Sequence, residues 1–214
     1  QESAVTLFRM DAGVDSGAIL CQQWFDVAAE AYAQDVYQAV ASNLRHAYLK
    51  VYEAHASGTP LPEAPQTRSE ASYRAKRTPA DGHLDFGRPA KEISRLIRAV
   101  SKPYPGAYTY YAGTKITVWE CSLDAIPAYQ GVVGQILRRD DQRLLVQCGD
   151  QPIWLANFES PAGPQAARQF RTGRKFGYAV EDELCELRAE LDEMRERVRQ
   201  LEAASAAATW RTPS

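Results

Sequence analysis

Two carboxylates near the start of the chain are the first candidates for chemistry. Asp11 and Asp15 lie in the loop sequence DAGVDSG, directly after the apolar stretch AVTLFRM. Aspartates beside glycine most often only shape a turn, and the pattern alone favours that role. The same loop is not a phosphate-binding loop, because no Lys follows Gly17 and no G-x-G-x-x-G spacing is present. A nucleophile elbow of the G-x-S-x-G type is also missing from the sequence.

The remaining reactive residue types are scattered. No cysteine pair has the C-x-x-C spacing, and no histidine is separated from a cysteine by the number of residues that is usual for zinc ligands. We therefore expect no metal, reduced thiols and a cytoplasmic protein. The short basic cluster at Arg74, Lys76 and Arg77 is interpreted as solvated surface, with anion binding as the alternative. The scattered cysteines are Cys21, Cys121, Cys148 and Cys185, and the histidines are His46, His55 and His83.

The composition restricts the class of protein. The 214 residues suffice for one domain or two small ones, and 45% hydrophobic with 24% charged residues is typical of a globular chain. The net charge of −2 argues against a general nucleic-acid binder. No apolar run has the length of a membrane span, and the first residues lack the features of a signal peptide.

The elements that must position the loop follow from hydrophobic periodicity. Strands are expected at 4–10 and 18–25, on either side of the loop, and a helix at 29–56. Gly58 is suited to end that helix. The apolar face expected for the helix consists of Val36, Val40, Leu44 and Val51.

A proline-rich linker at 59–68 is expected to be extended and exposed. A second helix begins at Pro89 and ends before Pro103, and 161–173 is expected to be a loop. Short strands between them suggest a small OB-like barrel. The strands are expected near 106–111, 115–122, 131–138, 143–148 and 152–158. The expected domains are 1–88, 89–175 and 176–214.

The last segment carries an unbroken heptad pattern. Apolar residues alternate spacings of three and four, and the pairs Glu183–Arg188, Glu190–Arg195 and Arg197–Glu202 at the g and next e positions are opposite in sign. Residues 181–202 hold nine acidic and four basic residues, a net charge of −5. The pattern favours a parallel homodimeric coiled coil, and a helix packed on its own barrel is the alternative. The seam residues are Leu184, Leu187, Leu191, Met194, Val198 and Leu201.

Four segments, in order, resemble one enzyme family. They are VTLFRMD with GVDSGAIL, YRAKRTPADGHLDF at 73–86, ISRLIRAVSKPYPGAY at 93–108 and TKITVWE at 114–120. Together, over residues 3–159, they resemble the formyltransferases that use 10-formyltetrahydrofolate. The resemblance implies an α/β part, the second half of a Rossmann-like catalytic domain, followed by an all-β OB-like barrel; the coiled-coil helix is an addition to this plan.

The resemblance also implies roles for the residues around the loop. Asp15 matches an aspartate that lies beside a catalytic histidine and raises the pKa of that histidine, since a carboxylate favours imidazolium. The backbone of the strand end would line the folate co-substrate. The family's Asn-x-His motif is not in this sequence, so we expect the chain alone to be inactive and another half, from the same gene or another chain, to complete it. The folate-lining residues are Leu7, Phe8, Arg9, Met10 and Asp11.

Two branches of the family differ in substrate. Residues 103–172 contain six basic and six acidic residues, and this zero net charge disfavours methionyl-tRNA, whose phosphates demand a basic surface. The sequence therefore predicts formyl transfer to the amino group of an amino-sugar nucleotide, with no nucleic-acid or membrane partner. A methionyl-tRNA formyltransferase is the alternative within the family, and a non-catalytic binding or dimerisation module is the alternative outside it.

Overall fold

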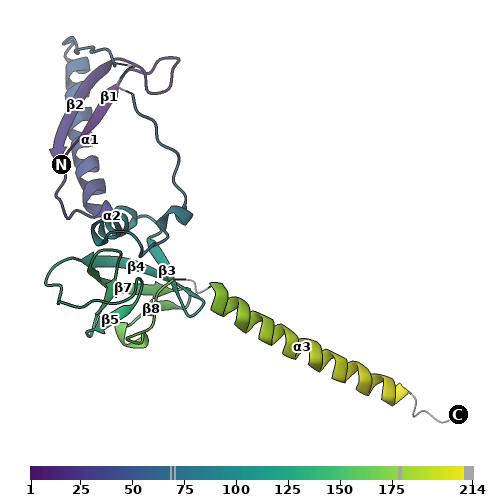
Figure 1. The fold of residues 1–214 in the computed structure, drawn as a ribbon. Helices are drawn as coiled ribbons and strands as arrows, with labels where there is room; N and C mark the ends of the chain where they lie inside the picture. Colours follow the sequence, from purple (N-terminus) through teal and green to yellow (C-terminus); the bar gives the residue numbers. More distant parts are fainter. Residues whose placement is uncertain (68, 70, 178–179, 210–214) are drawn as a thin grey trace.

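The chain forms three parts that follow one another along the sequence. The computed structural model describes residues 1–67, 69, 71–177 and 180–209. Figure 1 shows a strand pair with a long helix, then a compact sheet domain, then a single helix that projects away from it. We call residues 1–56 the hairpin unit, 57–78 the connector and 79–177 the sheet domain. All pairs of named strands are antiparallel, so helices combine with antiparallel sheets.

The hairpin unit confirms both expected strands and the expected helix. Strand β1 (Glu2–Phe8) pairs with β2 (Ile19–Asp26), with Val5 opposite Gln23. Helix α1 (Ala33–Ala56) lies along this pair and ends at Ser57, whose backbone N–H donates to the carbonyl of Glu53.

The expected apolar face of α1 is only partly correct. Ala47 is buried and Val36 and Val51 are half-buried, whereas Val40 and Leu44 are 36% and 43% exposed. At 3.6 residues per turn, the apolar side chains from Val36 round to Tyr52 spread over about 160° of the helix surface. Two strands cover one side of that arc, and the other side remains in solvent. The exposed side carries Tyr37, Val40, Leu44, Tyr48 and Tyr52.

The connector returns from the far end of α1 to the sheet domain, and most of its described residues are exposed, as expected for a proline-rich linker. It also makes one contact that the composition does not predict. Ala64 pairs with Ile19 at the start of β2 through two backbone hydrogen bonds of 2.7 and 3.0 Å. The connector therefore braces the hairpin unit. It ends at a 3-10 turn, η2 (Pro79–Gly82).

The sheet domain contains the five expected strands and one more. Its order is β3-β4-β7-β6-β5, with β8 added beside β7. The prediction of a loop at 161–173 is wrong, because a turn at Gly163, with φ of +115°, returns the chain to pair with β7 before the 3-10 turn η3 (Ala167–Gln169). The strands are β3 (Ala107–Tyr111), β4 (Thr114–Ser122), β5 (Ile136–Arg139), β6 (Arg143–Gln147), β7 (Pro152–Ser160) and β8 (Gly163–Gln165).

Residues 173–177 run between the two edge strands of this sheet. The Ile136 N–H on β5 donates to the carbonyl of Arg174 at 2.8 Å, and the Gly177 N–H donates to the carbonyl of Tyr110 on β3 at 2.9 Å. Strands β3 and β5 are not paired with each other, so the strand order itself is open.

The main hydrophobic core belongs to the sheet domain. Helix α2 (Ala90–Val100) places Ile93 and Ile97 against the sheet, where Val118, Leu144 and Leu155 are fully buried. The carboxylate of Asp150 accepts the Ala90 N–H at 2.7 Å and so satisfies one free donor at the start of α2.

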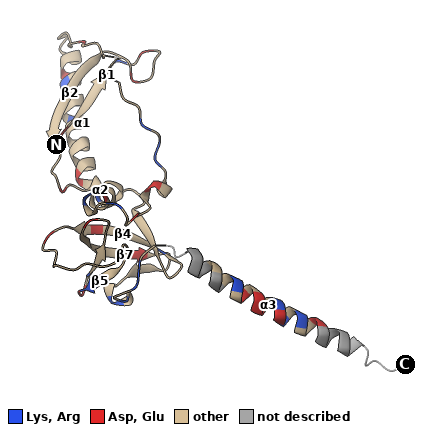
Figure 2. Cartoon of the chain, viewed as in Figure 1, with Lys and Arg blue, Asp and Glu red and all other residues tan. Residues whose placement is uncertain are grey.

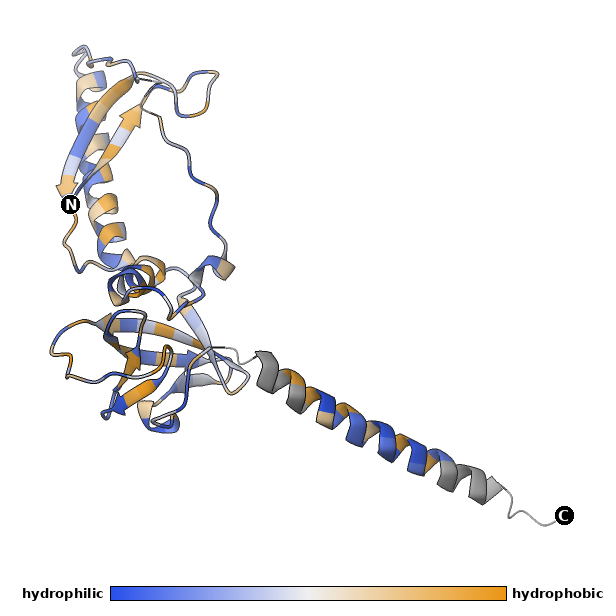
Figure 3. Cartoon of the chain, in the orientation of Figure 1, coloured by the Kyte–Doolittle hydropathy of each residue, from blue (hydrophilic) through white to orange (hydrophobic). Residues whose placement is uncertain are grey.

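Helix α3 (Val180–Thr209) includes the predicted heptad segment. Its seam residues are 43% to 64% exposed, so the alternative of a helix packed on its own barrel is wrong. Apolar positions recur along the helix between strongly hydrophilic ones (Figure 3), and basic and acidic residues are interspersed along it (Figure 2). Neither α3 nor any other helix of the described chain is apolar enough over a sufficient length to cross a membrane.

Candidate functional site

The two carboxylates of the loop between β1 and β2 have different surroundings. One oxygen of Asp11 accepts the Gly13 N–H at 2.9 Å and the Ser16 hydroxyl at 2.8 Å, so Asp11 shapes the turn. Asp15 has a positive φ of 52° and makes no side-chain hydrogen bond or ion pair with the described residues. Both side chains are exposed. Asp15 is therefore the carboxylate of this loop that is free to meet another group.

Gly17 fixes where the loop closes. A Cβ on this residue would lie 1.6 Å from the carbonyl oxygen of Arg9, so only glycine allows the two chain segments to approach this closely. The Arg9 N–H donates to the carbonyl of Ala18 at 2.9 Å and completes the closure. The loop is held at its base while its tip carries Asp15.

The strand end that should line the co-substrate has an open edge. Strand β1 pairs with β2 on one side, and within the described residues no strand pairs with its other side. Leu7 and Phe8 are half-buried, and Arg9, Met10 and Asp11 are exposed. Free backbone donors and acceptors on such an edge can hydrogen-bond a flat heterocycle without special side chains.

Sequence reasoning missed the connector residues that brace this loop. Glu63 forms an ion pair with Arg9, and the Gln66 amide donates to the carbonyl of Gly17 at 2.7 Å. Arg9 at the end of the strand offers a guanidinium with which a carboxylate can pair, but its side chain is exposed and does not require a partner. The sequence did not indicate which of its many carboxylates would pair with it.

Among the described residues, no histidine or cysteine side chain bonds to Asp15, although Cys21 lies on β2 opposite Leu7. His83 instead lies against Tyr108 in the sheet domain, with ring centres 5.3 Å apart and the ring planes tilted by 52°. Nor do three metal-ligating side chains gather anywhere in the described chain. Burial raises the pKa of Cys148 to about 12 and also raises the pKa of Cys121. Both thiols are protonated at neutral pH, which makes them poor nucleophiles.

The middle of the chain matches a known family model. Residues 76–175 match the family model described as the formyl transferase C-terminal domain. The match begins just before η2 and includes α2 and all six strands of the sheet domain. The match covers the end of the connector and nearly all of the sheet domain.

Solved structures extend the likeness to the hairpin unit. HypX from Aquifex aeolicus in complex with tetrahydrofolic acid is 16% identical, with a TM-score of 0.62 over 83% of this chain and 34% of that one. The N-formyltransferase from Helicobacter canadensis, in complex with folinic acid and dTDP-3-aminofucose, is 20% identical, with a TM-score of 0.54 over 77% of this chain and 56% of that one. WlaRD, a sugar 3N-formyl transferase, is 20% identical, with a TM-score of 0.52 over 72% of this chain and 54% of that one.

At these identities the likeness concerns the fold. It covers more of the chain than the family model, which matches 100 of 214 residues, so the hairpin unit shares in it. The chain spans a third to somewhat over half of the length of these relatives.

Proposed function

We propose that this chain is part of an enzyme that transfers a formyl group from 10-formyltetrahydrofolate to the amino group of an amino-sugar nucleotide. The family match of residues 76–175 carries the proposal. Two relatives of similar fold support the substrate class, since one is a complex with folinic acid and dTDP-3-aminofucose and the other is a sugar 3N-formyl transferase.

The residues of the hairpin unit fit the co-substrate and the reaction. 10-Formyltetrahydrofolate supplies the formyl group when it is bound. The open edge of β1 at Leu7 and Phe8, with the residues Arg9 to Asp11 that follow it, offers backbone groups that would hold its flat ring. The free carboxylate of Asp15 would hold a histidine from the completing half in its imidazolium form and orient it. As imidazolium that histidine can donate a proton, and the neutral imidazole left behind can then accept the proton that the attacking amine must lose.

The experiment uses the enzyme with its Asn-x-His half present and follows radiolabelled formyl. We expect the label on the amino group of a dTDP-amino sugar. Asp15→Asn should lower kcat at least a hundredfold, because general acid–base catalysis contributes about 10²–10⁴-fold. The matched control is Asp26→Asn, an exposed carboxylate at the other end of β2, and it should leave kcat unchanged. Normal turnover in the Asp15 variant would exclude its proposed role.

The two alternatives predict other outcomes of the same assay. Label on charged initiator tRNA, with a steep salt dependence, would identify the tRNA branch. No transfer to any amine would favour a non-catalytic binding module. The zero net charge of residues 103–172 continues to argue against tRNA.

We also propose that the sheet domain is an OB-like barrel completed by residues 173–177. The hydrogen bonds from this segment to β5 and β3 support closure of the ring. The domain bounds 1–88, 89–175 and 176–214 stay predictions.

The thiols of Cys21, Cys121 and Cys148 are unpaired, which is typical of a reducing compartment and supports a cytoplasmic location.

The exposed seam of α3 supports a parallel homodimer through residues 181–202. A second copy fits because each of the three g–e pairs brings opposite charges together. Burying one leucine-sized side chain of the seam stabilises the pair by about 1.5–3 kcal/mol. Leu191→Asp would place two carboxylates face to face and should dissociate the dimer in sedimentation equilibrium. Ala189→Asp adds the same charge on the outer side and should keep it. A monomeric wild type would refute the coiled coil.

A further inference from the structure

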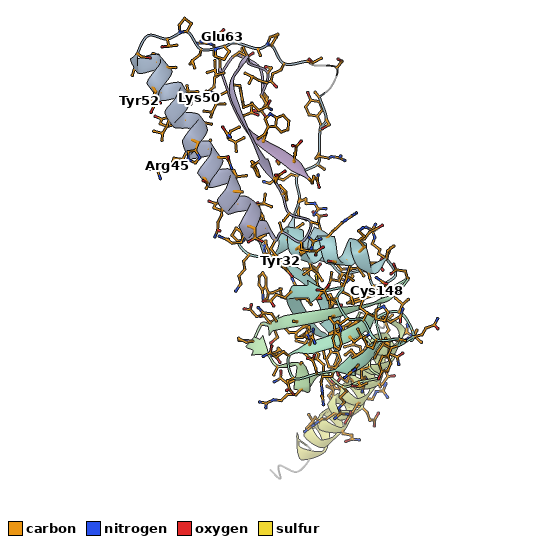
Figure 4. All side chains as sticks on the ribbon, turned by 90° about the vertical axis from the view of Figure 1, so that its left-hand side faces the viewer. Tyr32, Arg45, Lys50, Tyr52, Glu63 and Cys148 are labelled. Carbon is orange, nitrogen blue, oxygen red and sulfur yellow. The ribbon has the colours of Figure 1, made fainter. Side chains whose placement is uncertain are left out.

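A cavity of about 460 Å³ lies where the hairpin unit meets the sheet domain. The first two turns of α1 form one wall, α2 forms the second, and the turn after α2 contributes Tyr104. Figure 4 places Tyr32 at this junction, while Lys50 and Tyr52 lie towards the other end of α1. Cavities of about 300–1,000 Å³ at the interface of two units are usual for small-molecule sites.

Two residues make the walls rigid. The Tyr32 hydroxyl donates to the carbonyl of Cys121 at 3.3 Å and accepts its N–H at 3.2 Å, so the ring is fixed against β4. Arg98 is 13% exposed and donates to the carbonyls of Ala29 and Ala31 at 2.8 and 3.1 Å. The cavity is therefore largely formed before any ligand binds, and preorganised walls lower the entropic cost of binding.

The charges around the cavity favour an anion. Arg98 is occupied by backbone carbonyls and lies 3.6 Å from Glu30. Arg95, one turn earlier on α2, is exposed and forms no ion pair in the part of the chain that the structure describes. No carboxylate is among the described residues that line the cavity. A ligand's negative group would thus meet a free guanidinium, which binds carboxylate and phosphate in a bidentate manner.

The remaining lining favours a flat ring. Tyr32, Tyr37 and Tyr104 surround the space together with small or branched aliphatic side chains such as Val36 and Ala99. Aromatic side chains contact another ring by offset stacking or edge-to-face, beyond the gain from area alone. Tyr37 and Tyr104 are 58% and 54% exposed, so a ligand would remove substantial apolar surface from water.

We propose that this cavity binds a planar aromatic ring that carries a negatively charged group, with the ring among the tyrosines and the anion on Arg95. A nucleotide and the benzoyl-glutamate tail of a folate share this chemistry. The cavity lies at the opposite end of the hairpin unit from the Asp15 loop (Figure 1), so it is a second site and not part of the proposed formyl-transfer centre.

Calorimetry on the full 214-residue chain tests the site with two probes, dTDP and p-aminobenzoylglutamate. We expect one of them to bind with a dissociation constant below a millimolar. The separate parts of the probe that binds should each bind at least tenfold more weakly. These parts are thymidine and pyrophosphate for dTDP, and p-aminobenzamide and glutamate for p-aminobenzoylglutamate. The probe that binds identifies the source of the ligand, and added salt should weaken its binding. No formyl donor is present, so the result is independent of the proposed catalytic activity.

Matched variants locate the binding. Arg95→Gln and Tyr37→Ala should each weaken it at least tenfold. Lys91→Gln removes a charge one turn away on α2, and Tyr48→Ala removes an equally exposed ring on α1; neither lines the cavity, and both should bind as the wild type does. Circular dichroism confirms that each variant is folded. No binding of either probe at millimolar concentration would overturn the proposal, as would equal binding by the Arg95 and Lys91 variants.

Discussion

The hairpin unit and the sheet domain differ in how completely they bury their own apolar surface. The sheet domain encloses a continuous core that includes large side chains such as Phe158, Phe170 and Leu155. In the hairpin unit the buried hydrophobic residues are Val5, Cys21, Ala33 and Ala47, and two of them are alanines. Several of its larger side chains, including Trp24 at 58% exposure, face solvent.

The difference shows which part can stand by itself. A six-stranded sheet covered by a helix has the layers that a stable domain needs, whereas two strands and one helix are marginal. The hairpin unit carries the proposed catalytic loop and has the weaker core. The expected completing half would have the apolar surface of the later turns of α1, at Leu44, Tyr48 and Tyr52, to cover.

The largest effect should come from the core of the sheet domain. Leu155→Ala removes a side chain with 0% exposure and should lower the free energy of unfolding by about 2–5 kcal/mol, because a cavity remains. Leu44→Ala on α1, 43% exposed, is the matched control and should cost less than about 1 kcal/mol. Urea denaturation measures both. Equal losses would mean that the two parts bury their leucines equally well.

A smaller effect should follow from loosening the contact between the two parts. Arg98→Ala removes the one guanidinium nitrogen that donates to both Ala29 and Ala31, a charged contact worth about 1.5–3 kcal/mol. Hydrogen exchange in α1 should accelerate at least tenfold while exchange in β6 and β7 stays unchanged. Arg95→Ala, on the same helix but without an ion pair among the described residues, should leave exchange in α1 as it is. Equal exchange in the two variants would show that Arg98 does not hold the joint.

The smallest effect concerns a cap within the sheet domain. The Ala90 N–H holds the pKa of the Asp150 carboxyl below its ordinary value. A lowered pKa in the folded state adds stability above the unfolded pKa of about 3.9, and this stability disappears as the pH falls through the lower folded value. Asp150→Ala should cost about 1 kcal/mol at pH 7, as for the loss of a helix cap, and less at pH 3.

Urea midpoints of the wild type and this variant at pH 7, 4 and 3 measure that change. Asp141→Ala, in the β5–β6 turn, is the surface control and should change the free energy of unfolding by less than about 0.5 kcal/mol. A stability difference that grew towards pH 3 would contradict the assigned cause.

Local periodicity was enough to predict most of the helices and strands, but it could not predict which distant segments of the chain pair with each other. The strands flanking the loop and the five sheet strands follow from alternation and turn residues, which are local signals. The face of α1 was misassigned at Val40 and Leu44 because an apolar arc does not reveal how much of it a two-stranded partner can cover. The strand at Gly163–Gln165 was missed because it is too short to show a period.

In the candidate site, too, the local features could be predicted from the sequence and the long-range contacts could not. Asp15 and the strand end were located from the loop sequence and its resemblance to a family, and the structure adds that Asp11 serves the turn. Glu63 pairs with Arg9 and Gln66 with Gly17, and these partners are 54 and 49 positions apart in the chain. No single sequence pattern specifies such a contact.

The projecting helix α3 also determines how the protein moves through a solvent. Its 30 residues extend for about 45 Å at 1.5 Å per residue. A rod attached to a compact body raises friction far more than it raises mass. The chain of 23.8 kDa should therefore diffuse slowly and leave a size-exclusion column ahead of a spherical protein of equal mass, even as a monomer. Elution volume alone would then imitate a dimer, whereas sedimentation equilibrium, which is independent of shape, would not.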